Sequence, residues 1–143
     1  MIQLNLTPNH QTPKGSILSV TPMQLVAEAR AQIQEVDPQT AWDRMSNPVQ
    51  ILDVREASEY EAGRIPGAVN VPRGILEFRI GELPDFVNKA APVLIYCRTG
   101  GRAALAAVQL SRMGYTDLKS ITGGIMAWQA ANLPVETEKT DYY

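Results

Sequence analysis

The chemistry of this sequence centres on its single cysteine, Cys97, in the stretch VLIYCRTGGRAALAAVQL at residues 93–110. A compact apolar run precedes it and a helix-like run follows, with two glycines and two arginines between them. Glycines permit backbone angles that other residues avoid, so successive N–H groups can turn towards one centre. Those N–H groups, the positive end of the following helix and the guanidinium groups of Arg98 and Arg102 favour negative charge there. We therefore expect Cys97 to ionise readily to a nucleophilic thiolate and its loop to attract an anion.

The alternative is that Cys97 is a packing residue, because free cysteines are among the most buried residue types. A packing cysteine needs neither a pair of glycines nor flanking arginines, so the composition of the loop favours the reactive interpretation. Arg102 is expected to contact the anion, because it closes the loop at the start of the helix. Arg98 is equally compatible with a solvated surface position. Thr99 is expected to offer its backbone N–H and its hydroxyl.

The elements around this loop indicate an α/β fold. Compact runs rich in β-branched residues are typical of buried parallel strands, and apolar residues at helical spacing mark the segments between them. The predicted strands are 49–54, 68–71, 93–96 and 118–121, and the predicted helices are 20–33, 38–45, 102–114 and 123–134. Strands that alternate with helices imply a parallel sheet with helices on both faces. Ligands gather at the carboxyl ends of such strands, where Cys97 is expected.

Composition and charge narrow the possible functions. The chain has 143 residues, of which 45% are hydrophobic and 20% charged, as in an ordinary globular domain. A formal net charge of -2 argues against nucleic-acid binding. One cysteine excludes an intramolecular disulfide, and with His10 the single histidine, a four-ligand Cys/His zinc site is excluded too. We find neither a secretory signal nor the ~20 apolar residues that span a bilayer, so we expect a cytoplasmic protein that does not bind membranes.

Three motifs, in order along the chain, resemble the rhodanese (thiosulfate sulfurtransferase) family in its single-domain form. They are ILDVREASEYEAGRIPGAVNVPRG at 51–74, VLIYCRTGGRAALAA at 93–107 and ITGGIMAWQAANLPV at 121–135. The resemblance implies a three-layer α/β domain over 35–135 with a central five-stranded parallel sheet and helices on both faces. An N-terminal arm and amphipathic helix (1–34) precede this domain, and a flexible tail (136–143) follows it. One departure is Arg64, where many members have histidine, at a position expected to support the fold.

The resemblance implies sulfur transfer through a persulfide on Cys97. The catalytic loop of the family maps onto residues 97–102, which makes Cys97 and Arg102 catalytic. The residues then expected to bind substrate are Arg98, Thr99, Gly100 and Gly101. Asp53 and Arg55 are expected to brace the site by an ion pair or hydrogen bonds. The expected donor is thiosulfate or a similar small anion, and the acceptor is cyanide or a thiol. A protein donor or acceptor is a further candidate, no cofactor or metal is expected, and the chain is expected to be a monomer.

Other functions compete with this one. A sulfur-relay or sensing module with little thiosulfate turnover would carry the same loop, so the sequence does not separate it from the enzyme. A catalytically dead interaction domain would be expected to have lost Cys97. Cysteine-dependent phosphatases resemble one another in a Cys-x5-Arg loop. Here Ala103 is the sixth residue after Cys97 and Arg102 the fifth, so the loop is one residue short for phosphate.

Three further expectations concern residues beside the loop. The helix over 20–33 lies outside the resemblance, and its apolar face is expected to pack on its own domain, with a partner or dimer contact as the alternative. Gly123 and Gly124 are expected to permit the turn into the last helix. Arg73 is a further candidate for the rim of the site.

Overall fold

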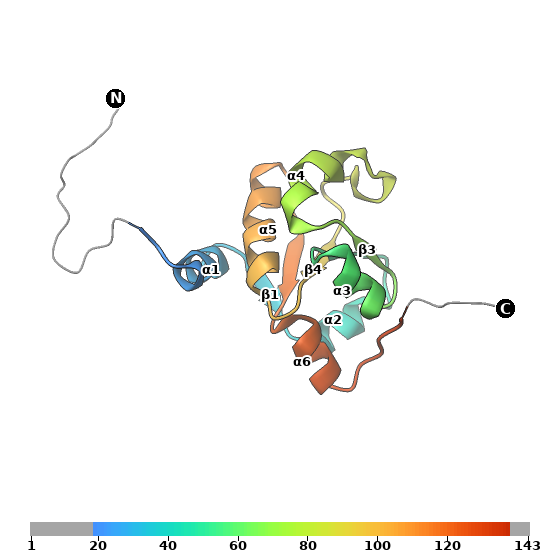
Figure 1. Cartoon of the computed structure of the whole chain (residues 1–143). Helices are drawn as coiled ribbons and strands as arrows, with labels where there is room; N and C mark the ends of the chain where they lie inside the picture. The colour runs from blue at the N-terminus through green and yellow to red at the C-terminus, as the bar shows by residue number, and fades with distance from the viewer. Residues whose placement is uncertain (1–18, 138–143) are drawn as a thin grey trace, which may run out of the picture.

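Five parallel strands form the centre of the computed structural model, which describes residues 19–137 (Figure 1). The strand order is β1-β5-β4-β2-β3, so β4, the strand that leads to Cys97, lies in the middle of the sheet. The strands are β1 (Gln34–Val36), β2 (Gln50–Asp53), β3 (Ala68–Asn70), β4 (Val93–Tyr96) and β5 (Leu118–Ile121). All neighbouring strands pair in parallel. The predicted five-stranded parallel sheet is therefore confirmed.

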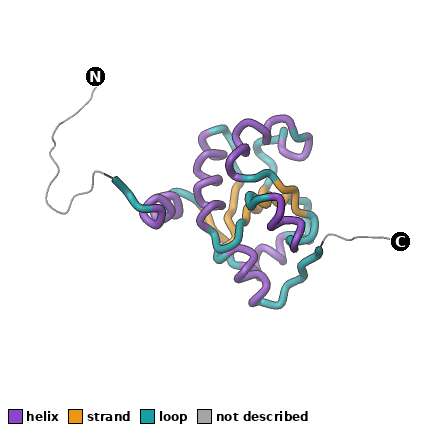
Figure 2. Tube along the Cα trace, viewed as in Figure 1, coloured by secondary structure: helices purple, strands orange, loops and turns teal. Residues whose placement is uncertain are grey.

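Helices cover both faces of this sheet, which gives the three layers that the sequence predicts (Figure 2). The α-helices are α1 (Pro22–Arg30), α2 (Pro38–Arg44), α3 (Ala57–Ala62), α4 (Leu76–Arg79), α5 (Gly101–Arg112) and α6 (Gly124–Ala130). Three 3-10 turns, η1 (Arg73–Ile75), η2 (Ile80–Glu82) and η3 (Pro84–Phe86), lie between β3 and β4. Residues of α4 and α5 cover one face, and residues of α2 and α6 cover the other.

The core forms on both sides of β4 because successive side chains of a strand point to opposite faces. Val93 and Ile95 join the cluster under α4 and α5, whereas Leu94 and Tyr96 join the cluster under α2 and α6. All four side chains are buried, as the continuous apolar run predicts. Cys97 continues the alternation and lies with the α5 cluster.

The N-terminal helix is shorter than predicted. Thr21 caps it by accepting a hydrogen bond from the Gln24 N–H at 3.1 Å, but the helix ends at Arg30 rather than near residue 33. The next residues form the short edge strand β1, which the sequence analysis missed because its three residues show no buried alternation. Since β1 begins at Gln34, the predicted domain boundary between residues 34 and 35 falls inside a strand.

Helix α1 packs against α5, as expected of a helix that contacts its own domain. Glu136, which the sequence analysis assigns to a flexible tail, is instead held by Arg64. The two residues exchange backbone hydrogen bonds of 2.9 Å, and their side chains form an ion pair of 3.3 Å. The rest of that predicted tail, from residue 138, lies outside the described residues, as do residues 1–18 of the predicted arm with His10.

Candidate active site

Cys97 follows β4 directly, and its sulfur receives two backbone hydrogen bonds from the loop that it opens. The N–H of Gly100 donates to Sγ at 3.1 Å, and the N–H of Ala103, in the first turn of α5, donates at 3.4 Å. The loop can turn back on the sulfur because Gly100 has φ of 113°, a conformation that glycine adopts without strain. Both amide dipoles are therefore aimed at an atom that is stabilised by them when it carries negative charge.

The Cys97 side chain is also buried. Cys97 is 1% exposed and belongs to the apolar cluster between the sheet and α5, which includes Val54 and Ala106. Burial by itself is typical of a packing cysteine. The two N–H groups on Sγ are the feature that a packing cysteine does not need, and they are what the reactive interpretation predicts.

The N-terminus of α6 fastens the loop from the other side. The N–H groups of Ile125 and Met126 donate to the carbonyl oxygens of Cys97 and Arg98, at 2.9 and 3.1 Å. This contact requires glycine at position 124, because a Cβ there would lie 2.5 Å from the Arg98 carbonyl oxygen. The sequence analysis predicts a tight turn at Gly123–Gly124, but it missed this docking of α6 on the loop.

Arg102 does not point freely at an anion site; it forms an ion pair with Glu59 of α3. It donates to both carboxylate oxygens, at 2.8 and 3.0 Å. Hydrogen bonding to Arg102 lowers the pKa of Glu59 from an ordinary 4.5 to about 2. The same bond raises the pKa of Arg102, and attraction to Glu59 and to Cys97 adds to the effect. Glu59 is a residue of the site that the sequence analysis missed.

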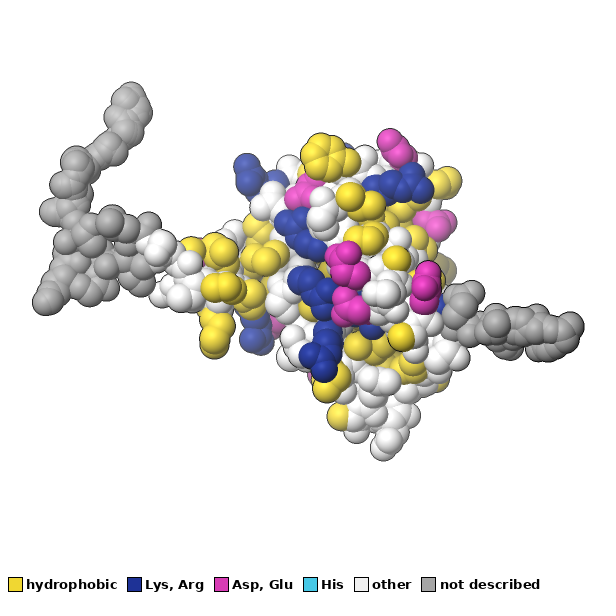
Figure 3. Space-filling view, in the orientation of Figure 1, with side chains coloured by type: hydrophobic (Ala, Val, Ile, Leu, Met, Phe, Trp, Pro, Cys, Tyr) yellow, Lys and Arg dark blue, Asp and Glu magenta, His cyan; other side chains and the backbone are white. Residues whose placement is uncertain are grey.

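The other loop residues differ in their surroundings. Arg98 and Thr99 are exposed, and within residues 19–137 Arg98 has no ion-pair partner. Gly100 is buried, and Gly101 begins α5. Figure 3 shows Lys and Arg side chains in a line across this face, between the apolar surface at α1 and a group of acidic side chains. An anion that approaches the loop therefore meets positive charge that is not fully neutralised.

Arg73 lies beside the site and binds Glu77. The Arg73–Glu77 ion pair measures 3.0 Å, and the Arg73 N–H donates to the carbonyl of Val54 at 3.0 Å. Its Nε is buried, and no partner for it is found among the described residues. The backbone of Arg73 is thus held near the end of β2, and its guanidinium is paired with Glu77.

Asp53 and Arg55 form a buried ion pair that ties together the carboxyl ends of β2 and β4. The Arg55 Nη2 donates to Asp53 at 2.6 Å and to the carbonyl of Gly63 at 2.7 Å. The Tyr96 hydroxyl donates to Asp53 at 2.6 Å and accepts from the Ile65 N–H at 3.1 Å. Burial raises the pKa of Tyr96, and the Asp53 charge raises it further. Burial opposes the charge of Arg55, but the hydrogen bond and attraction of Asp53 outweigh it and raise its pKa. With both oxygens occupied, Asp53 is placed to brace the site rather than to act as a base.

Residues 19–137 offer neither a cluster of metal-ligating side chains nor a helix that could span a membrane. No group of three or more His, Cys, Asp or Glu side chains is arranged to hold a metal ion there. None of the helices in this part of the chain combines the length and the apolar character needed to cross a bilayer.

Comparisons with known proteins agree with the fold and identify the family. The family model of the rhodanese-like domain matches residues 37–131. A sulfurtransferase of Allochromatium vinosum is 32% identical over 105 residues, which cover 72% of this chain and 94% of that protein. The thiosulfate sulfurtransferase GlpE of Actinobacillus succinogenes is 34% identical over 105 residues, 72% of this chain and 90% of that protein.

A solved structure of another protein shares this fold. A Rhodopseudomonas palustris protein of unknown function, described as a possible tyrosine phosphatase, has a TM-score of 0.74 and 30% identity, and the match covers 84% of this chain and 97% of that chain. The family model spans most of the chain, and the Allochromatium vinosum and Actinobacillus succinogenes sulfurtransferases are each matched along at least 90% of their length. The chain therefore belongs to the rhodanese-like sulfurtransferase family.

Proposed function

We propose that this protein is a sulfurtransferase that moves a sulfane sulfur from thiosulfate, or a similar anionic donor, to a thiophilic acceptor through a persulfide on Cys97. The observation that carries the proposal is the pair of N–H groups aimed at Sγ, from Gly100 and Ala103. A thiolate held in this way needs no side-chain base. Asp53 is not available as such a base, because its oxygens are already occupied by Arg55 and Tyr96.

The reaction has two displacements. The Cys97 thiolate attacks the outer sulfur of thiosulfate, a new S–S bond forms, and the old S–S bond breaks so that its electron pair leaves with sulfite. A cyanide or thiolate acceptor then attacks the outer sulfur of the persulfide, and the electron pair of that S–S bond returns to Cys97 as thiolate. The sulfur atom is passed on without an external oxidant or reductant. Covalent catalysis of this kind gives ping-pong kinetics.

The arginines act on the charge of the donor. Arg98 is exposed and unpaired within the described residues, so it can steer an anion towards the loop. Arg102 is held by Glu59 and acts on the sulfur and on the departing sulfite through its field. Thr99 and Gly101 contribute backbone N–H groups to the loop that surrounds the transferred sulfur.

Intact-mass measurement tests the proposal. After incubation with thiosulfate and removal of excess donor, the wild-type protein should carry one added sulfur atom, and cyanide should remove it. The Cys97→Ser variant, which keeps a similar shape, should gain none. A wild-type protein that gains no mass, or one that hydrolyses aryl phosphates efficiently, would contradict the proposal. The second outcome is a real alternative, since a solved relative is described as a possible tyrosine phosphatase.

A sulfur relay between proteins is the second candidate function, and one observation favours it. The loop of Cys97 borders a cleft much larger than thiosulfate or cyanide, with an apolar wall. Steady-state rates with thiosulfate and cyanide, compared with those for thiol acceptors, distinguish the two functions. A relay protein should show slow turnover with cyanide but fast transfer to the correct thiol.

A further inference from the structure

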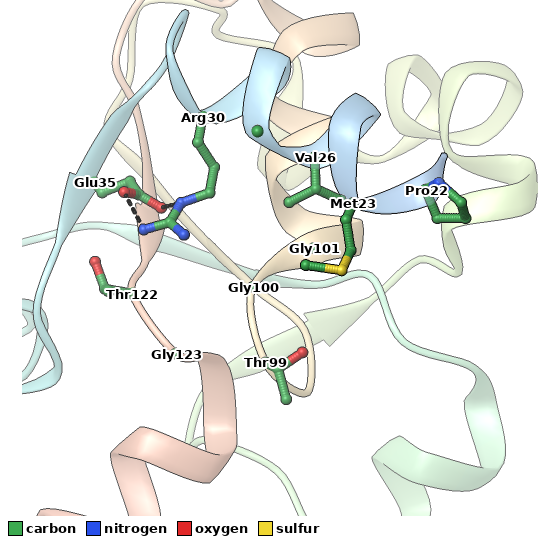
Figure 4. A pocket seen from close by; sticks show the side chains of 11 residues that line it. Pro22, Met23, Val26, Arg30, Glu35, Thr99, Gly100, Gly101, Thr122 and Gly123 are labelled. Atoms are coloured by element: carbon green, nitrogen blue, oxygen red, sulfur yellow. Dashed lines mark hydrogen bonds and ion pairs between the residues drawn. The ribbon is translucent and has the colours of Figure 1, made fainter. Parts of the chain in front are cut away.

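A cleft of about 580 Å³ lies between α1 and the loop of Cys97 (Figure 4). Met23 and Val26 of α1 form its apolar wall, and the backbone of Gly100, Gly101 and Gly123 faces them. The Arg30–Glu35 ion pair, 3.0 Å long, closes one end. Its volume falls within the range of about 300–1,000 Å³ that is usual for sites of organic ligands.

The occupant of this cleft is not the small inorganic donor. Thiosulfate and cyanide consist of a few atoms and offer nothing to an apolar wall, yet Met23 is left 82% exposed. Helix α1 lies outside residues 37–131, the part matched by the family model, so this wall is an addition to the shared domain. A helix that leaves a large apolar side chain exposed beside a catalytic loop is suited to bind the apolar part of a larger substrate.

The floor of the cleft favours a polypeptide as that substrate. Three glycines line it, and their lack of side chains lets another main chain approach closely. A Cβ at Gly101 would lie 3.4 Å from Val26 Cγ2, so a side chain there would fill space between the loop and α1 that is now open. The hydroxyls of Thr99 and Thr122 border the same floor and can pair with peptide groups (Figure 4).

We propose that the cleft binds an extended segment of a partner protein, with apolar side chains against α1, and that a cysteine of this segment is the acceptor of the sulfur. This proposal rests on the proposed function, since it names the acceptor for the persulfide of Cys97. Gly100 links the two sites, because its backbone lines the cleft while its N–H holds the sulfur at 3.1 Å. The cysteine thiolate of the segment attacks the outer sulfur of the persulfide, the new S–S bond forms on the segment, and the electron pair of the broken bond returns to Cys97. The proton of the acceptor thiol goes to solvent.

Two short synthetic peptides with one central cysteine test the proposal, one with leucines beside the cysteine and one with serines. Wild-type protein is loaded with thiosulfate and mixed with each peptide, and the added sulfur on the peptide is followed by mass spectrometry. The leucine peptide should react about tenfold faster, because burying part of a leucine is worth about that factor. Met23→Asp should reduce the difference to within about twofold. Leu25→Asp is the matched control, since Leu25 is an exposed residue of the same helix that does not line the cleft. It should keep the preference, and both variants should still become fully loaded with sulfur by thiosulfate, so that only the transfer to the peptide is compared.

Equal rates for the two peptides, or a preference that survives Met23→Asp, would overturn the proposal. A preference lost equally in Leu25→Asp would overturn it as well, because the effect would then not belong to the cleft. Binding of the leucine peptide with its cysteine replaced by serine, measured by fluorescence anisotropy, makes the same comparison without sulfur transfer. Failure of the wild type to load sulfur would thus count against the proposed function alone, while the binding data decide on the cleft.

Discussion

Replacement of Glu59 by glutamine tests the ion pair that holds Arg102 beside the loop of Cys97. Two hydrogen bonds from Arg102 lower the pKa of Glu59 from 4.5 to about 2. At about 1.36 kcal/mol for each pH unit, this difference corresponds to roughly 3 kcal/mol in favour of the folded state. The two side chains are 35% and 30% exposed, so solvent screens the pair. We therefore expect Glu59→Gln to lower the free energy of unfolding at pH 7 by about 1–2 kcal/mol.

The effect should depend on pH in one direction. The pKa of Glu59 is lower in the folded than in the unfolded state, so the ionised carboxylate stabilises the fold fully above the unfolded value of 4.5. That stabilisation is lost as the pH falls through 4.5 towards the folded value of about 2. Glutamine does not titrate. The difference in unfolding free energy between wild type and variant should therefore shrink by about half between pH 7 and pH 3.

Urea unfolding followed by the fluorescence of Trp42 and Trp128 measures this difference at both pH values. Glu82→Gln is the control, because the Arg79–Glu82 pair also measures 3.0 Å but its side chains are 51% and 67% exposed. The control should change the unfolding free energy by less than about 0.5 kcal/mol. A loss that is the same at pH 7 and pH 3, or a loss as large in the control, would refute the argument from the Arg102–Glu59 pair.

Two further predictions concern the loop itself. Gly124→Ala places a Cβ 2.5 Å from the Arg98 carbonyl oxygen, so it should displace the loop and slow persulfide formation from thiosulfate by at least about tenfold. Gly74→Ala, with open space at its Cβ, should leave that rate unchanged in the same rapid-mixing assay. Arg98→Gln removes an exposed charge and should lower kcat/KM for thiosulfate about threefold or more at low ionic strength, with the difference fading in high salt. A salt-independent loss in Arg98→Gln would mean that the side chain touches the donor rather than steering it.

The position of the Cys97 loop could be predicted from the sequence because its signals are local. The run VLIY is typical of a buried parallel strand. A strand end that is followed by two glycines and a helix indicates that the N–H groups of the loop turn towards the residue after the strand, which is Cys97. Strand β1 could not be predicted in the same way. It pairs on one side only, with β5, and its three residues carry no alternation that distinguishes them from the end of the preceding helix.

Site residues that are far from Cys97 in the sequence could not be predicted, for a different reason. Glu59 is one of three glutamates between residues 56 and 61, and only the placement of α3 beside the start of α5 selects it as the partner of Arg102. Gly124 reads as a turn residue, since nothing local shows that the Cys97 and Arg98 carbonyls approach it. Both roles arise from topology, which brings separate segments to the same edge of the sheet.

The arrangement around Cys97 supports the proposal that backbone groups, rather than a side-chain base, stabilise its sulfur. The sulfur is contacted by N–H groups of Gly100 and Ala103, and α6 holds the carbonyl side of the same loop. Asp53 accepts hydrogen bonds from Arg55 and Tyr96, and Arg102 is paired with Glu59. These charged side chains therefore support the loop and contribute to the electrostatic potential around it. Changes to those side chains should then alter rates or stability by degrees. Changes that move the main chain of the loop, as at Gly124, should slow sulfur transfer the most, because the proposed mechanism relies on the two N–H groups that contact Sγ.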